Sequence, residues 1–276
     1  MASESSRYAE FHAEFEALLE YAIALLDAQA GHKVQNAREN YGEKIFGKSV
    51  CHAISLKRIL PNPIDSKDSE IWDISSAYTL SRTILESYEA LAYVAVAGIS
   101  EEELECRILA WKLHAQERRH KMLSLIGSKD PRIAEIEKDM QALRELVLDN
   151  KFDQFLPPNV RGKITKDECP PYLVPRNIRL KAANVNAEYF TAALMHLSSH
   201  VHAHPFSLHQ LFDFKAGTPE AYGLMKIAGQ YACGFLAVSI REMSSLFSPR
   251  IPDPTADVRE TLENWCELLQ RGVRFA

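Results

Sequence analysis

Apolar side chains recur along this chain every three or four residues, the period of an α-helix, and no stretch shows the alternation of a β-strand. The longest such pattern runs from Ile71 to Ile126 and is interrupted at Gly98-Ile99-Ser100. It predicts a long antiparallel helical hairpin with its turn at this interruption. Because the first arm carries only three charges between Ile74 and Ala97, we expect neighbouring helices to cover it on most sides.

The other apolar patterns extend this hairpin into an all-α fold. We predict a helical bundle of seven to eight helices, built on the hairpin at about 71–126 and forming a single domain over residues 1–276. The predicted parts follow in chain order: N-terminal helices at 7–60, the central hairpin with a surface helix at 70–150, a proline-rich basic loop at 151–183, and C-terminal helices at 184–272.

One predicted helix raises the question of a membrane span. Thr218 followed by Pro219 is a strong helix start, and residues 222–240 are largely apolar. Lys226 and Gln230 interrupt this stretch, whereas a span needs about 20 consecutive apolar residues. We therefore expect a buried core helix.

Composition narrows the range of functions only slightly. The formal net charge is −5, with 46% hydrophobic and 25% charged residues, which is ordinary for a folded domain. This charge gives no general attraction to membranes or nucleic acids, so we expect no membrane partner. The five cysteines are scattered without a CxxC pair, and no signal peptide is visible. We expect a cytoplasmic protein with reduced thiols and no cofactor.

Charged side chains stand out from the apolar pattern in both arms of the predicted hairpin. Three of them, Arg82, Glu86 and Glu89, share one flank of the first arm, while Arg107 and His114 share one edge of the second. Antiparallel pairing of the arms brings Glu86 near His114 and Glu89 near Arg107. Two interpretations stay open: a structural ion-pair network, or a pocket in which His114 or Glu86 acts as an acid or base.

Half of the ten histidines lie between residues 196 and 209. His196 and His200 are four residues apart on a predicted helix, which is the spacing of metal ligands. No Asp or Glu occurs between residues 189 and 212, however, so a third ligand has to come from elsewhere. A divalent metal at His196 and His200 is one alternative. The others are histidines that contact a ligand or catalyse a reaction, and histidines that cap the helix end.

The stretch from residue 151 to 181 has the strongest local charge bias. It carries seven basic and three acidic residues, with five of the thirteen prolines. A loop of this length inside a compact domain is uncommon. Two interpretations stay open: a solvated crossover, or an arm that contacts RNA or an acidic partner.

A pair of short motifs resembles a broad family of bacterial all-helical proteins of unknown function. The motifs are Arg82-xxx-Glu86 on one helix and, later, Leu197-Ser198-xx-Val201-His202-xx-Pro205. The resemblance implies that four residues converge in space: Arg82, Glu86, Ser198 and His202. It implies no particular reaction.

A weaker resemblance links the chain to HEPN ribonuclease domains, which use an Arg and a His separated by four to six residues. Arg107 and His114 have six residues between them, although Ile108 stands where those nucleases usually carry a polar residue. The resemblance implies that His114 acts as an acid or base on RNA while Arg107 stabilises the phosphate.

Together these patterns predict a helical protein that binds a small or phosphate-bearing molecule. Its polar pocket is expected between the central hairpin and the histidine-rich helix end, with these ligand contacts: Arg82, Glu86, Arg107, His114, Ser198 and His202. Among them, His114, His202 and Glu86 are the candidates for catalysis, although no nucleophile is evident. A metal-binding protein, a HEPN-like ribonuclease and an interaction module without a catalytic site are the alternatives. Whether the protein forms a homo-oligomer also stays open.

Overall fold

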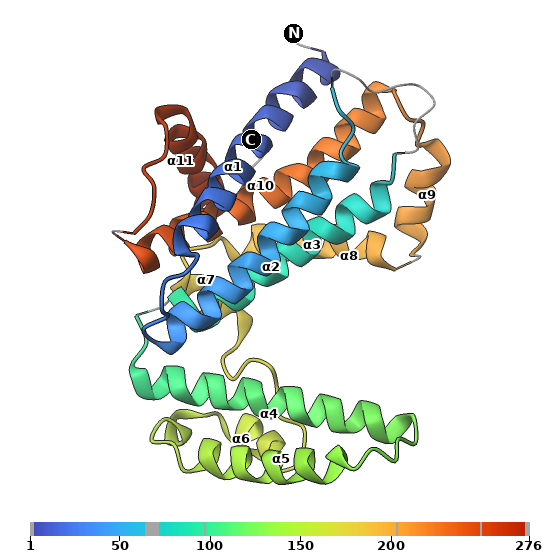
Figure 1. Cartoon of the computed structure of the whole chain (residues 1–276). Coiled ribbons are helices and arrows are strands. Elements are labelled where there is room, and N and C mark those ends of the chain that lie inside the picture. Colours follow the sequence, from blue (N-terminus) through green and yellow to red (C-terminus); the bar gives the residue numbers. More distant parts are fainter. Residues whose placement is uncertain (1–2, 64–71, 97, 203, 249, 274–276) are drawn as a thin grey trace. The chain divides into compact units, whose positions relative to one another are not determined.

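A computed structural model describes residues 3–63, 72–96, 98–202, 204–248 and 250–273 (Figure 1). These residues form helices and connecting turns, with no strand among them, which confirms the predicted all-α class. They contain eleven α-helices, so the expected number of seven to eight is too low.

Contacts divide the chain into two compact units. Unit 1 comprises Met1–Val96 and Leu180–Ala276, and unit 2 comprises Ala97–Arg179. The division falls between the two arms of the predicted hairpin, which was expected at 71–126. The hairpin prediction is therefore wrong in its pairing, because its first arm belongs to unit 1 and its second arm to unit 2. That the whole chain is one domain stays a prediction.

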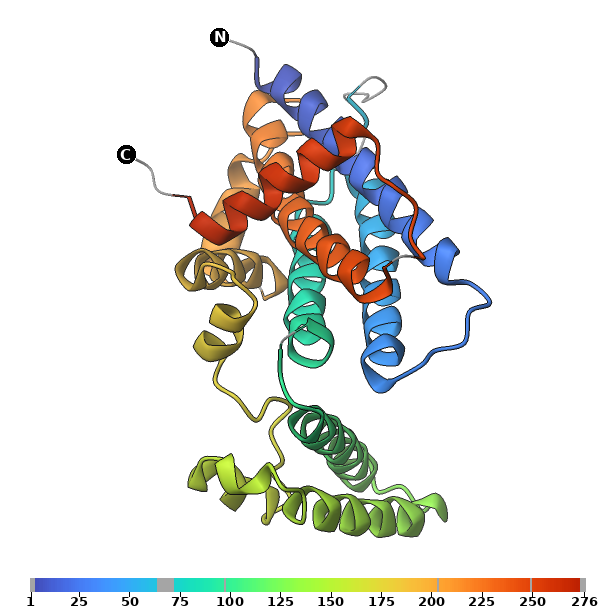
Figure 2. The same cartoon turned by 90° about the vertical axis from the view of Figure 1, so that its left-hand side faces the viewer.

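Unit 1 is built on six long helices: α1 (Glu4–Gln29), α2 (Ala37–Ile59), α3 (Ile74–Leu91), α8 (Ala187–Val201), α10 (Pro219–Phe247) and α11 (Ala256–Arg271). Helix α3 continues into one turn of π-helix, Ala92–Val96, and packs against α2, α8 and α10. It is covered on several sides, as its low charge predicted. Helix α10 packs against α1, α2, α3 and α11 (Figures 1 and 2).

Two glycines let α10 lie close to its neighbours. A Cβ atom on Gly229 would stand 2.1 Å from Cζ of Phe11 in α1, and one on Gly234 would stand 2.3 Å from Cδ1 of Leu269 in α11. The helix begins as predicted, with the Thr218 hydroxyl accepting a hydrogen bond from the Ala221 amide. It passes the length and composition test for a membrane span, but 67% of its most apolar window is buried inside unit 1, as in a core helix.

Unit 2 is a pair of helices, α4 (Glu101–Leu125) and α5 (Arg132–Leu148), packed side by side (Figures 1 and 2). Helix α5 is the surface helix that the sequence predicted, with most of its side chains exposed. The apolar core between the helices is completed by residues from the following stretch. Its buried members are Cys106, Ala110, Leu113, Ile136, Met140, Val147, Leu156, Ile164, Cys169 and Leu173.

The predicted loop at 151–183 is not a loop throughout. It contains a turn of 3₁₀-helix, Asp153–Phe155, and two short helices, α6 (Pro158–Ile164) and α7 (Arg176–Ala182). Pro158 opens α6, where a missing amide hydrogen costs nothing. In the same way Pro205 opens α9 (Pro205–Asp213), a helix that the sequence analysis did not predict.

Candidate functional site

The charged flank of α3 is a pair within one helix. Arg82 Nε donates a hydrogen bond to Glu86 Oε1 at 3.0 Å, and Arg82 Nη2 lies 2.9 Å from the same oxygen. The Arg82 and Glu86 side chains are 24% and 44% exposed. A partly hydrated pair four residues apart on a helix contributes little to stability.

The other two residues of the family resemblance form local contacts of their own. The Ser198 hydroxyl donates to the Leu194 carbonyl within α8, and the exposed His202 ring stacks on His204 with centroids 5.2 Å apart. None of the contacts described for these side chains joins α3 to Ser198 or His202. The convergence that the resemblance implies stays a prediction.

Arg107 and His114 lie on α4, in unit 2. The Arg107 guanidinium pairs with Glu103, one turn earlier on the same helix. His114 Nδ1 lies 2.6 Å from the Cys169 carbonyl oxygen. We expected Glu86 near His114 and Glu89 near Arg107 because the two arms of the hairpin were predicted to pair. The arms belong to different units, so this reason no longer holds.

His196 and His200 occupy the buried side of α8, with ring centroids 6.2 Å apart. Within the described part of the chain no group of three His, Cys, Asp or Glu side chains is placed to hold a metal ion. His200 Nε2 lies 2.9 Å from Gln210 Oε1 in α9, so this nitrogen carries the proton and donates. His200 Nδ1 is buried and has no hydrogen-bond partner.

His196 forms part of a different arrangement, facing α10. Its Nδ1 lies 3.3 Å from the Tyr231 hydroxyl oxygen, and its ring meets that of Tyr78 edge-on at 5.1 Å. Burial lowers the pKa of His196, and the neighbouring His200 lowers it further. Burial also lowers the pKa of His200, outweighing its hydrogen bond to Gln210. Both imidazoles are therefore neutral near pH 7.

Beside His196 and Tyr231 a cavity of about 550 Å³ opens between α8, α10 and α11. We call it the α8–α10–α11 pocket. Its wall is mostly apolar and aromatic, with a few polar groups. The lining side chains that bear on its chemistry are Tyr189, His196, Gln230, Tyr231, Trp265 and Arg271.

One asparagine closes the end of this pocket. The Asn186 backbone amide donates to the Leu269 carbonyl at 2.9 Å, and Asn186 Nδ2 donates to the Arg271 carbonyl at 3.2 Å. Its Oδ1 accepts from the Tyr189 amide as the cap of α8. Gly272 follows at φ +75°, where a Cβ would stand 2.9 Å from Asn186 Cγ. The start of α8 and the end of α11 are thus fixed to each other.

The pocket is neutral inside and charged at its rim. Burial raises the pKa of Tyr189 and of Tyr231, so both phenols keep their protons. Glu188 and Arg271 also line the pocket, and both are exposed. The Arg271 side chain is 75% exposed and pairs with Glu267.

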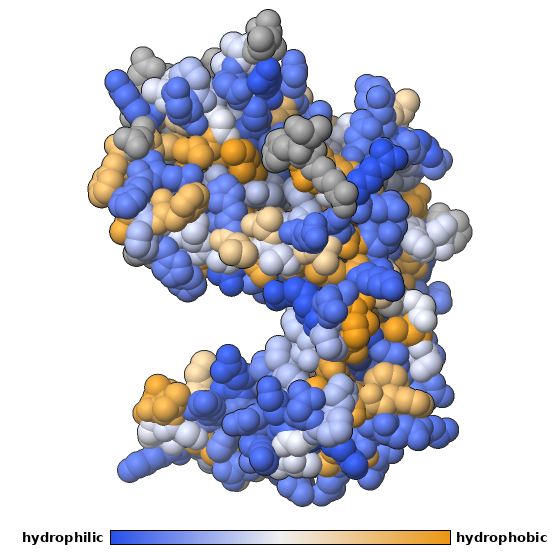
Figure 3. Space-filling view, turned by 180° about the vertical axis from the view of Figure 1, so that it is seen from behind, coloured by the Kyte–Doolittle hydropathy of each residue, from blue (hydrophilic) through white to orange (hydrophobic). Residues whose placement is uncertain are grey.

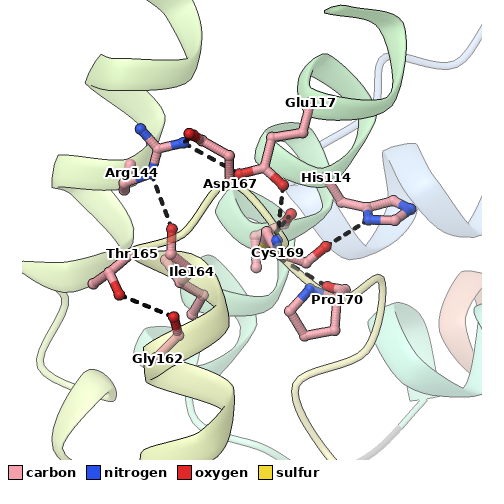
Figure 4. Close-up of polar contacts among 10 residues, drawn as sticks. His114, Glu117, Arg144, Gly162, Ile164, Thr165, Asp167, Cys169 and Pro170 are labelled. Carbon is pink, nitrogen blue, oxygen red and sulfur yellow. Dashed lines mark hydrogen bonds and ion pairs between the residues drawn. The ribbon is translucent and has the colours of Figure 1, made fainter. Parts of the chain in front are cut away.

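Unit 2 holds a second polar cluster, centred on Glu117 (Figure 4). Glu117 Oε2 accepts a hydrogen bond of 2.7 Å from the Cys169 amide, and Arg144 Nη2 lies 3.3 Å from Glu117 Oε1. Arg144 also pairs with Asp167 and donates from Nε to the Ile164 carbonyl at 2.9 Å. Burial raises the pKa of Glu117, outweighing the amide and Arg144. These contacts tie α4, α5 and the segment after α6 together.

Comparisons with models of protein families, with curated proteins and with solved structures gave no match to this chain. The assignment of a site therefore rests on geometry. In the sequence, His196 stands out by its spacing from His200. Its pocket neighbours Tyr189, Tyr231 and Trp265 do not, because they follow the apolar helical pattern. Glu117 and Arg144 were missed because single charges on a surface-type helix carry no distinguishing signal.

Proposed function

We propose that the α8–α10–α11 pocket binds a small molecule with a planar ring and a polar edge, a nucleobase or nucleotide being the class that suits it. The observation that carries this proposal is the His196–Tyr231 pair set in the wall of a mostly apolar pocket. A few convergent polar groups in an apolar cavity are the usual mark of a ligand site, and 550 Å³ lies in the usual size range.

The aromatic side chains account for the planar ring. Tyr189 and Tyr231 stand with centroids 6.0 Å apart and planes inclined at 54°, and Trp265 lines the same cavity. Aromatic faces gain from contact with another flat ring. The Gln230 amide supplies one acceptor and two donors in the same wall, which suits the edge of a base.

Arg271 accounts for a charged substituent. Its guanidinium is exposed at the rim, where it can turn from Glu267 toward a phosphate without loss of buried contacts. This keeps the ligand class expected from the sequence, a small or phosphate-bearing molecule. The contacts come from α8, α10 and α11 in this proposal, rather than from the Arg82–Glu86 flank.

Thermal unfolding of the full chain with nucleosides and their 5′-monophosphates tests the proposal. A ligand at a hundred times its Kd stabilises the folded state by about 2.7 kcal/mol, which raises Tm measurably. Ala192→Trp places a bulky ring in the pocket from an exposed position of α8 and should abolish the shift. Thr191→Trp, at the exposed neighbour outside the pocket lining, should leave the shift in place.

Arg271→Gln separates the two parts of the ligand. It should weaken binding of the monophosphates by about tenfold, the scale of one charge-assisted contact, and leave the nucleosides unchanged. The proposal fails if none of these compounds shifts Tm, or if a shift survives Ala192→Trp.

The contacts described do not favour the alternatives to the same degree. A metal at His196 and His200 lacks a third ligand among the described side chains. In a HEPN-like ribonuclease Arg107 and His114 would contact RNA, but here Arg107 pairs with Glu103 and His114 contacts the Cys169 carbonyl. The ribonuclease and the interaction module both stay predictions.

A further inference from the structure

The turn between α4 and α5 in unit 2 exposes large apolar side chains. Met122, Leu125 and Ile126 are 64%, 78% and 75% exposed. Figure 3 shows hydrophobic residues gathered at one end of unit 2, beside hydrophilic ones. Adjacent exposed apolar side chains of this size mark an interaction surface more often than single ones do.

An ordered turn holds these side chains outward. The Gly127 amide donates to the Ser124 carbonyl and the Ser128 amide donates to the Leu123 carbonyl, both at 3.0 Å. Gly127 has φ +62°, so this is the left-handed glycine ending of a helix. In many such endings an apolar residue after the glycine folds back on the helix, but Ser128 stands there. The apolar side chains before the glycine therefore keep their exposure without a covering residue.

Basic side chains surround the apolar ones. Arg118 lies one helical turn before Met122, and Lys121 lies one turn before Leu125, which is about 6 Å along the axis. Arg119 and Lys129 are exposed nearby. Residues 118–132 carry five basic residues and one acidic residue, and that acidic residue, Asp130, already pairs with Arg132. The tip, as we call this surface of residues 118–132, thus has a net charge of +4 within a negative chain, while Glu137 of α5 pairs with His120 at its edge.

We propose that the tip inserts into the headgroup layer of an anionic lipid bilayer. Leu125 and Ile126 would enter the boundary with the acyl chains, while Lys121, one turn back, and Arg118, about two turns back, would reach the phosphates and carboxylates above. The net charge of −5 led us to expect no membrane partner, but such attraction depends on the charge within about one Debye length of the surface.

Other occupants fit less well. A second copy of the tip would bring two positive surfaces together, which is unfavourable. An acidic protein would satisfy the charges, but it would need an apolar pocket to receive two adjacent aliphatic side chains. A bilayer supplies both features over its whole surface.

Co-sedimentation of the full chain with lipid vesicles tests this proposal. The vesicles contain phosphatidylcholine alone, or phosphatidylcholine with about a third phosphatidylserine. We expect binding to the second kind only, weakening as salt rises. Leu125→Ser with Ile126→Ser should reduce binding at least tenfold, and Arg118→Gln with Lys121→Gln should reduce it several-fold. These side chains are exposed, so the variants should fold normally, which circular dichroism can check.

Phe212→Ser is the matched control, because Phe212 is 80% exposed on α9 of unit 1, a helix that contains no Lys or Arg. It should bind vesicles like the unaltered chain. The proposal is overturned if the unaltered chain does not bind phosphatidylserine vesicles, or if the Leu125 and Ile126 variant binds equally well. Binding to soluble polyglutamate but not to vesicles would also overturn it, in favour of an acidic protein partner.

Discussion

Units 1 and 2 are both helical, but they stabilise their interiors differently. Unit 1 relies mainly on apolar contact, with α10 brought close to α1 and α11 by Gly229 and Gly234, while its pair of Glu39 with Arg250 joins the start of α2 to the segment after α10. Unit 2 has a smaller core and adds a buried ion pair, Glu117 with Arg144, across its helices. A small unit buries a lower fraction of its surface, so directional polar contacts matter more to its geometry.

The polar groups near the α8–α10–α11 pocket also differ from Glu117 in how they are partnered. In unit 1, the Tyr78 hydroxyl, His196 Nε2 and His200 Nδ1 are buried without hydrogen-bond partners, close to the α8–α10–α11 pocket. In unit 2 both carboxylate oxygens of Glu117 have partners. Because an unpartnered buried polar group costs free energy, its retention points to a use beyond packing. This is why we place the ligand in unit 1 and assign a structural role to Glu117.

Removing the Glu117 carboxylate should give the largest effect. Glu117→Ala leaves the Cys169 amide without an acceptor and removes one of the three acceptors of Arg144, the others being Asp167 and the Ile164 carbonyl. Breaking a buried pair costs about 3 kcal/mol or more. Urea unfolding, with hydrogen exchange read over residues 101–173, measures it. Glu117→Gln is the matched control: it keeps an acceptor for the Cys169 amide and should cost less. A loss under about 1 kcal/mol for Glu117→Ala would mean that unit 2 depends on its apolar contacts and not on this ion pair.

Two glycines of α10 give the next effect, and they should change stability in opposite directions. Gly229→Ala forces the Phe11 ring to move and should cost about 1–3 kcal/mol despite the better helix propensity. Gly223 has open space around its Cβ position, so Gly223→Ala should stabilise by up to about 1 kcal/mol. Thermal unfolding of both variants tests the idea, and equal effects would show that close approach does not matter at Gly229.

A shift from about pH 7 to about pH 5 should act oppositely on the two units. His196 and His200 have pKa values lowered below 6.5, so they favour the folded state fully above that pH. This contribution is lost as the pH falls from about 6.5 toward their folded pKa values. Glu117 has its pKa raised above 4.5, so its contribution is greatest below that pH and is lost as the pH rises through the folded pKa.

Hydrogen exchange, corrected for its intrinsic pH dependence, should therefore show weaker protection in α8 and stronger protection in α4 at the lower pH. Glu117→Gln should remove the response of α4 and leave that of α8. A parallel loss in both units would contradict the assignment of these groups.

The smallest effect should come from the Arg82–Glu86 pair. A double-mutant cycle with alanine at both positions should give a coupling of about 0.3–0.5 kcal/mol, typical of a partly exposed pair on one helix. A coupling well above about 1 kcal/mol would restore the buried ion-pair network considered from the sequence.

Helix identity was predictable from the sequence, but helix pairing was not. The seam along α3 correctly indicated a helix covered on several sides. The helical period of apolar residues shows which face of a helix is buried, but not which helix covers that face. The sequence therefore suggested α4, the next helix along the chain, as the partner of α3, whereas α3 packs against α2, α8 and α10. The short helices α6, α7 and α9 have about two turns each, too few to show a helical period. Prolines near them suggested loops, but Pro158 and Pro205 stand at the first position of α6 and α9.

The candidate site was predictable only in part. His196 was noticed because four-residue spacing of histidines is uncommon, whereas Tyr189, Tyr231 and Trp265 have the spacing of core residues. Arg271 lies at the end of the last helix, where a basic residue needs no explanation beyond the helix dipole. Only the packing of α8, α10 and α11 shows that these residues share a cavity.

The division of the chain also has a consequence for the order of folding. Unit 2 is one continuous segment, whereas unit 1 joins Met1–Val96 to Leu180–Ala276. During synthesis unit 2 can complete its contacts as soon as its own residues have emerged, but α1, α2 and α3 can pack only against one another until α8 and α10 follow. Contacts so distant in sequence form slowly. The faces of α3 that α8 and α10 cover are meanwhile exposed, so a nascent chain halted after unit 2 should be the form most prone to aggregate and most dependent on chaperones.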